Sequence, residues 1–231
     1  MALKPVNNDA FYREVDEELR RDQLKSVWQR YGIAIVAGVV LLLAAVGGYI
    51  WWQQRQEVRA GEHAELLTGV FDALDARRTQ GVSEKLDTLV AEGSDGYRAA
   101  GLLTKADLAI QQQNLTQAAA IFKRVAEDEG LARPYRDLAL VRQTAIEFDR
   151  LPPATVIARL GPLAKAGEPW FGSAGELVAL AHLKQNNSRA AAPIFAAMAK
   201  DETLPGSIRS RAVQMAGALG VDATADANTK E

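Results

Sequence analysis

The sequence of 231 residues contains no cysteine, only two histidines and few aromatic residues (6%). Without cysteine, the chain has no disulfide framework, no cysteine-ligated zinc site and no thiol nucleophile. His63 and His182 lie far apart in the sequence, so we expect neither a histidine-rich metal site nor a compact Ser-His-Asp triad. A formal net charge of −2 argues against a generally basic protein that binds nucleic acid. We therefore expect no enzymatic activity, no cofactor and no nucleic-acid partner.

Alanine is the most abundant residue type in the chain. This composition favours closely packed helices, because alanine is the best helix former and a poor strand former. Helical periodicity, interrupted by short turn signals, continues along most of the chain after Arg55. The pattern predicts an all-α fold with helices at 57–79, 84–92, 96–112, 116–129, 134–150, 154–165, 173–185, 188–200 and 206–219.

One segment is far more apolar than the rest. Residues 32–52 read GIAIVAGVVLLLAAVGGYIWW and contain no charged side chain. As a helix they would extend roughly 31 Å, about the thickness of the hydrocarbon core of a bilayer. We predict a single transmembrane helix at 32–52, with the lipid bilayer as its partner. The side chains that suit the headgroup region at its two ends, and that we predict as membrane-interface anchors, are Trp28, Arg30, Tyr31, Tyr49, Trp51 and Trp52.

Two other interpretations of this segment are a buried core helix and a cleaved signal peptide. A core helix this apolar would need a large protein around it. A signal peptide would need an unusually long charged region before it, and the residues that follow the segment offer no small-residue cleavage site. An uncleaved anchor fits better.

Lysine and arginine predict how the span is oriented. Six of these residues precede it, whereas the stretch 53–72 that follows contains only Arg55 and Arg59. The positive-inside rule then places the N-terminus in the cytoplasm. In a bacterial cell the chain would be a single-pass inner-membrane protein, with a cytoplasmic tail at 1–31 and a periplasmic part from position 53 onward.

The cytoplasmic tail contains acidic and basic side chains in equal number, and the stretch 9–30 contains neither proline nor glycine. Tyr12, Val15 and Leu19 share the apolar side of a predicted helix. Two interpretations stay open: a solvated juxtamembrane helix without a partner, or a segment that docks on a cytoplasmic or membrane partner.

The part after the span contains an internal repeat. The segment 106–140 aligns with the segment 179–213, and more than a third of the aligned positions are identical. A helical hairpin of the repeat class takes about 34 residues, so the shift between the two segments corresponds to two such units. We predict a short α-solenoid of about four hairpins plus a capping helix, in a domain at 53–220 followed by a flexible tail at 221–231.

Each aligned copy resembles the tetratricopeptide repeat. A small residue on the first helix precedes a small residue on the second by twelve positions, and an aromatic and an apolar residue follow. Small residues let the two helices of a hairpin cross closely, and the phenylalanine fills the gap to the next hairpin. The two sets are Ala106, Ala118, Phe122 and Val125, and Ala179, Ala191, Phe195 and Met198.

The whole chain resembles the YfgM family, the ancillary subunits of the SecYEG translocon. The resemblance covers residues 8–219, and it is carried by the stretch FYREVDEELRRDQLKSVWQRYG that runs directly into the span. It implies an inner-membrane protein with a periplasmic repeat domain. The implied partners are translocon subunits and a membrane-anchored periplasmic chaperone of the prolyl-isomerase-like type. A scaffold of another envelope complex, for cell-wall synthesis, division or outer-membrane assembly, is the alternative.

The sequence contains no phosphate-binding loop, no HExxH motif and no dinucleotide-binding glycine motif. Ser173 with Glu176 is typical of a capping box, and Asn114 with Gln117 is typical of a similar helix start. We expect His182 to be structural and His63 to lie on the surface.

We therefore expect the chain to act through its surface, as a protein-interaction module. The first helix of each hairpin builds the concave face of a solenoid. Trp170 and Phe171 lie in the connector GEPWFGSAG, where they either fill a hole between hairpins or form an exposed aromatic contact for a partner. The candidate partner contacts on first helices are Arg98, Lys105, Gln112, Arg142, Gln143, Lys184 and Gln185.

Overall fold

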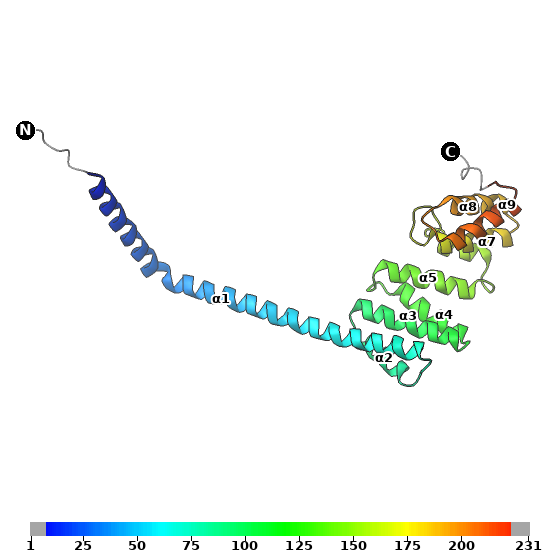
Figure 1. Ribbon diagram of the computed structural model, residues 1–231, viewed down its shortest axis with the longest axis horizontal. Helices are drawn as coiled ribbons and strands as arrows, with labels where there is room; N and C mark the ends of the chain where they lie inside the picture. Colours follow the sequence, from blue (N-terminus) through cyan, green and yellow to red (C-terminus); the bar gives the residue numbers. More distant parts are fainter. Residues whose placement is uncertain (1–7, 223–231) are drawn as a thin grey trace, which may run out of the picture. The chain divides into compact units, whose positions relative to one another are not determined.

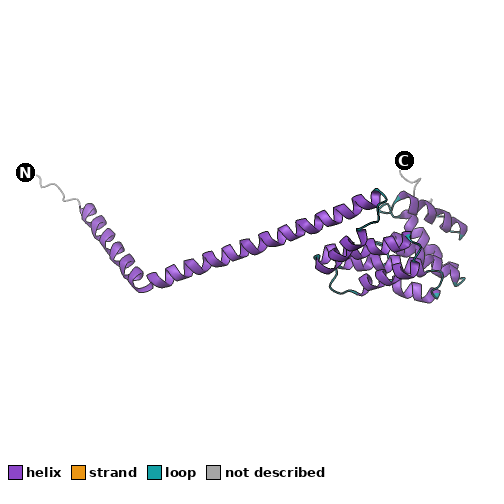
Figure 2. Ribbon diagram, turned by 90° about the horizontal axis from the view of Figure 1, so that it is seen from below, coloured by secondary structure: helices purple, strands orange, loops and turns teal. Residues whose placement is uncertain are grey.

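A computed structural model describes the backbone of residues 8–222 and the side chains of residues 28–222. In this part of the chain the regular elements are nine α-helices and no strand, which confirms the predicted all-α fold (Figure 2). The chain divides into two compact units, Met1–Arg59 and Ala60–Glu231. The predicted apolar side of the tail helix, Tyr12, Val15 and Leu19, lies outside the described side chains, and most of the predicted C-terminal tail lies outside the described residues.

The first helix, α1, runs from Asn8 to Asp75. The sequence predicted separate helices for the tail, the span and the stretch 57–79, but the structure joins them into one. No proline occurs between Pro5 and Pro134, so nothing in the covalent chain interrupts the backbone hydrogen bonds of this segment. The helix ends at Asp75 rather than at position 79, because a turn follows in which Arg77 (φ 55°) and Gly81 (φ 75°) adopt left-handed conformations.

The unit from Ala60 onward is a stack of helical hairpins (Figure 1). The last turns of α1 share a buried cluster with α2, α3 packs on α4, and α7 packs on α8. The shorter α6 follows α5, and α9 packs on α8 as a capping helix. Four hairpins and a capping helix were predicted, and the structure confirms them. The bounds are α2 Val82–Glu92, α3 Asp95–Gln111, α4 Leu115–Glu127, α5 Arg133–Glu147, α6 Pro153–Leu160, α7 Phe171–Lys184, α8 Ser188–Lys200 and α9 Gly206–Ala218.

The largest difference from the predicted bounds of the hairpin helices is at α6, which ends at Leu160 rather than at position 165. Gly161 follows in a helical conformation (φ −52°, ψ −40°), but Pro162 comes next and has no backbone N–H to continue the helical hydrogen bonds. The connection to α7 is then irregular and includes Gly167 at φ 89°.

The internal repeat holds in the structure. Each small, aromatic or apolar residue that the sequence assigned to the core of the two copies is at most 1% exposed. The turns inside the two hairpins also match, because Gln113 (φ 60°) and Asn186 (φ 57°) occupy the same left-handed position. Asn114 and Asn187 then cap α4 and α8, each accepting a backbone hydrogen bond of 3.1 Å from the residue three positions later. The predicted cap at Asn114 is therefore confirmed.

The capping box predicted at Ser173 and Glu176 is wrong. The helix α7 begins at Phe171, so Ser173 lies inside it, and no side chain caps this end. The reason is packing: Phe171 and Gly172 are buried, and a side chain on Gly172 would come within 3.0 Å of Leu204. These contacts hold Phe171 and Gly172 within the first helical turn.

Candidate protein-interaction site

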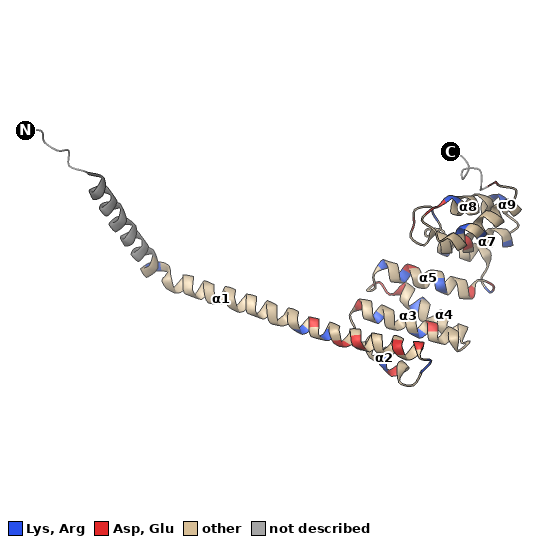
Figure 3. Ribbon diagram, in the orientation of Figure 1, with Lys and Arg blue, Asp and Glu red and all other residues tan. Residues whose placement is uncertain are grey.

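The apolar stretch of α1 is accessible along all of its length except Gly32. Its most apolar 18-residue window has a mean hydropathy of 2.6 and is 0% buried. The interpretation as a buried core helix is therefore wrong, because a core helix would be mostly buried. Figure 3 shows this stretch as a long uncharged portion of the helix. α1 is long and apolar enough to cross a membrane.

Aromatic rings and arginines meet at both ends of this stretch. The guanidinium of Arg30 lies 5.9 Å from the ring centroid of Tyr31, and that of Arg55 lies 5.1 Å from the ring of Trp51. Paired rings and cations of this kind suit the polar–apolar boundary of a bilayer. Tyr49 and Trp52 have ring centroids 6.5 Å apart. The predicted aromatic anchors Trp28, Tyr31, Tyr49, Trp51 and Trp52 are each more than half exposed, at 51–63%.

Three ion pairs, each between residues 35 positions apart, link the α3, α5 and α7 segments and the capping helix α9 in series. Asp107 of α3 binds Arg142 of α5, and Asp149, just after α5, accepts a hydrogen bond of 2.8 Å from Lys184 of α7. Glu176 of α7 accepts two from Arg211 of α9, at 2.9 and 2.8 Å. This separation is one repeat unit, so an acid in one unit neutralises a cation in the next.

The predicted partner contacts at Lys105, Arg142 and Lys184 are consequently occupied within the chain. Lys105 binds Asp87 of α2. The ammonium of Lys184 also lies 4.1 Å from the ring centroid of Phe148. Arg98 is similar, with Asp95 at 3.3 Å and Asp128 at 3.4 Å. These cations hold neighbouring segments together rather than presenting free charge.

The predicted glutamines divide into two groups. Gln112 and Gln185 are exposed at the ends of α3 and α7. Gln143 is only 4% exposed and donates a hydrogen bond of 3.2 Å to Glu147, which also binds Arg159 at 2.8 Å. Gln143 is thus part of the interface between α5 and α6 and is not available to a partner.

Phe171 is only 2% exposed, so it does not form the exposed aromatic contact that was one of its two predicted roles. It packs in the cluster that contains Ala179, Phe195 and Ala212. Trp170 is half-buried against the neighbouring cluster. Phe171 therefore fills a gap between hairpins, and it is removed from the candidate binding surface.

The two histidines lie in different surroundings. His63 is half-buried, with its ring centroid 5.7 Å from that of Tyr97, rather than on the open surface. His182 is half-buried on α7, and its Nδ1 has no hydrogen-bond partner among the described residues. Within residues 28–222, no group of three or more His, Asp or Glu side chains is placed to hold a metal ion.

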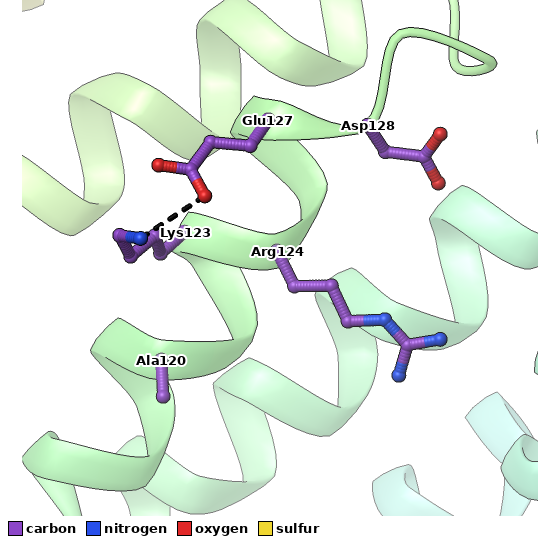
Figure 4. Close-up of a pocket in the computed structure, with 5 residues that line it drawn as sticks. All are labelled: Ala120, Lys123, Arg124, Glu127 and Asp128. Atoms are coloured by element: carbon purple, nitrogen blue, oxygen red, sulfur yellow. Dashed lines mark hydrogen bonds and ion pairs between the residues drawn. The ribbon is translucent and has the colours of Figure 1, made fainter.

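The surface of α4 is hollowed by two adjoining depressions, which the sequence did not indicate. One has a volume of about 380 Å³ and is lined by Ala120, Lys123, Arg124, Glu127 and Asp128 (Figure 4). The other, of about 390 Å³, extends to the end of α5. They share Ala120 and Lys123, and together we call them the α4 groove. Its remaining lining residues are Thr116, Ala119, Glu147, Arg150 and Leu151.

Comparison with known proteins agrees with this architecture. The family profile of the tetratricopeptide repeat-like domain matches residues 25–216. No curated protein and no solved structure matches the chain. The matched residues include the apolar part of α1 and the stack of hairpins up to α9. By this match, and by its repeated small-residue and phenylalanine core, the chain belongs to the tetratricopeptide repeat-like domain family.

Proposed function

We propose that this chain is a membrane-anchored protein-interaction module without enzymatic activity. Repeat domains of the tetratricopeptide type serve in general to bind other proteins. The observation that carries the membrane part is the accessible apolar stretch of α1. Its most apolar window is 0% buried, and exposing so much apolar surface to water is unfavourable. A lipid bilayer is the environment in which this helix is stable.

The resemblance of residues 11–32 to the YfgM family supports a finer proposal. The chain is an ancillary subunit of the Sec translocon, and its repeat domain links the translocon to a membrane-anchored periplasmic chaperone. The excess of lysine and arginine before the span supports a cytoplasmic N-terminus in the bacterial inner membrane. The repeat domain then works in the periplasm, on secreted or envelope proteins.

Affinity purification of the tagged full chain from mild detergent tests this proposal. Recovery of translocon subunits and a periplasmic chaperone, above the level obtained with an unrelated tagged single-pass protein, is the expected result. Recovery of cell-wall, division or outer-membrane assembly proteins instead would replace the translocon role with that of another envelope scaffold. Recovery of neither group would contradict both roles.

Protease added to intact spheroplasts tests the orientation. Digestion of the repeat domain, with protection of an N-terminal tag, is expected. If the repeat domain is spared while the same amount of protease digests it after lysis, the proposed orientation is wrong.

A further inference from the structure

Arg124 and Arg150 are exposed cations without a partner. Within the described residues, neither side chain has a hydrogen bond, an ion pair or a ring contact. This distinguishes them from Arg98, Lys105, Arg142 and Lys184, each of which is paired with a carboxylate. Free positive charge therefore lies beside α4, on a surface for which the sequence predicts no partner contact.

Both arginines line the α4 groove, one in each depression. The acidic residues of the groove are all neutralised. Glu127 binds Lys123 at 3.0 Å, Asp128 binds Arg98 at 3.4 Å, and Glu147 binds Arg159 at 2.8 Å. In Figure 4 the Lys123–Glu127 pair lies on one side of α4, and Arg124 extends on the other side. The uncompensated charge of the groove is therefore positive.

Apolar side chains line part of the groove. Ala120 lines both depressions, and Ala119 and Leu151 line the second of them. Alanine leaves room for the side chains of an incoming segment, whereas arginine binds carboxylates with geometric preference through its planar donor fork. Apolar lining residues together with a free arginine in each depression suit a protein segment that alternates carboxylates with small apolar side chains.

We propose that the α4 groove binds an acidic segment of the partner protein, with one carboxylate on Arg124 and another on Arg150. This inference rests on the proposed function, because it names the surface and the partner chemistry through which the interaction module works. The groove is lined by α4 and by residues at and just after the end of α5, and none of its lining residues takes part in the three ion pairs between residues 35 positions apart.

Binding of synthetic peptides to the full chain in detergent tests the proposal. The probe is a fluorescein-labelled twelve-residue peptide that repeats Glu-Ala-Leu, and the comparison peptides carry glutamine or lysine in place of every glutamate. Fluorescence anisotropy is expected to show binding of the glutamate peptide only. Each of R124Q and R150Q is expected to weaken it about fivefold, the upper limit for an ion pair at an accessible site.

The matched control is R189Q, which changes another exposed arginine without a partner, near the start of α8. It is expected to leave binding unchanged. A120W, which places a large ring where Ala120 lines both depressions, is expected to abolish binding while circular dichroism shows the same helix content. The proposal is overturned if the glutamine peptide binds equally well or if R189Q weakens binding as much as R124Q. It is also overturned if single-stranded DNA of equal charge competes as well as the peptide, since the groove would then bind anions in general.

The same variants separate this inference from the proposed function. Suppose that affinity purification of the wild-type chain recovers its partners, and that the double variant R124Q/R150Q recovers them equally well. The groove is then not the docking surface, and the interaction function stands. If the peptide binds and responds to R124Q but no envelope partner is recovered, the groove proposal stands and the translocon role fails.

Discussion

Arg211 on α9 donates two hydrogen bonds to the carboxylate of Glu176 on α7, from Nε at 2.9 Å and from Nη2 at 2.8 Å. The pair fixes the capping helix to the first helix of the preceding hairpin. We expect R211Q to lower the melting temperature of the repeat domain, because a glutamine cannot replace a charged two-pronged donor. R189Q, which removes an arginine without a partner, should leave it unchanged. An equal loss in both variants, measured by thermal unfolding, would contradict a role for this pair.

Salt and pH distinguish this ion pair from simple packing. Hydrogen bonding to Glu176 is the larger cause, and attraction to its negative charge the smaller one, by which the pKa of Arg211 is raised above its ordinary value. A cation with a raised pKa stabilises the fold at every pH below the unfolded-state pKa, and this contribution is lost only in strongly alkaline solution. The difference between wild type and R211Q should therefore be the same at pH 7 and pH 9. It should shrink at high salt, because the pair is exposed and screened.

Phe122 and Phe195 should contribute similarly to stability, since both residues are 1% exposed and occupy equivalent repeat positions. Replacing either by alanine should cost about 3–5 kcal/mol of the free energy of unfolding. Because the two rings belong to different buried clusters, the costs should add. Urea unfolding of the full chain in detergent measures the effect, and Phe71, which is 47% exposed, provides the control. A comparable loss in F71A would mean that burial does not explain the result.

Gln113 holds a left-handed conformation that glycine adopts without strain. We expect Q113G to stabilise the folded chain by up to about 1 kcal/mol. The neighbouring Q112G should not, because Gln112 has an ordinary φ of −81°. N186G should gain less than Q113G, since asparagine tolerates this conformation better than glutamine does. A loss of stability in Q113G, measured by the same urea titration, would show that the side chain makes a contribution larger than the strain.

A charge in the middle of the apolar stretch should weaken membrane insertion. Leu42 is 64% exposed in the described structure. An arginine at the centre of a transmembrane helix costs about 2.5–3.5 kcal/mol of apparent insertion free energy. We expect L42R to lower the fraction of chain retained in membranes after alkaline carbonate extraction, and L42A to have little effect. If L42R is retained as fully as wild type, this stretch does not set the membrane attachment.

The apolar stretch, the helical periodicity and the internal repeat were all predictable from the sequence. These features depend on residues close in the chain or on a pattern that recurs, so local spacing is enough. Phe122 and Phe195 show this well, because their position relative to the small residues before them predicts burial in both copies. The caps at Asn114 and Asn187 follow from local hydrogen bonding in the same way.

Which charges are free could not be predicted without the packing of the helices. Lys105, Arg142 and Lys184 are charged side chains of the kind that binding surfaces contain. Stacking of the hairpins, however, places an acidic side chain beside each of them. The burial of Phe171 and the inclusion of Ser173 within α7 follow from contacts with α8, α9 and the loop between them, which no neighbouring residue specifies.

The amino-acid order is thus enough to specify an apolar helix and a stack of hairpins, because periodic burial needs only local spacing. The unpaired state of Arg124 and Arg150 is set by the folded stack, because most of the carboxylates around them are neutralised by cations of other helices, which lie far away in the chain and close only in space.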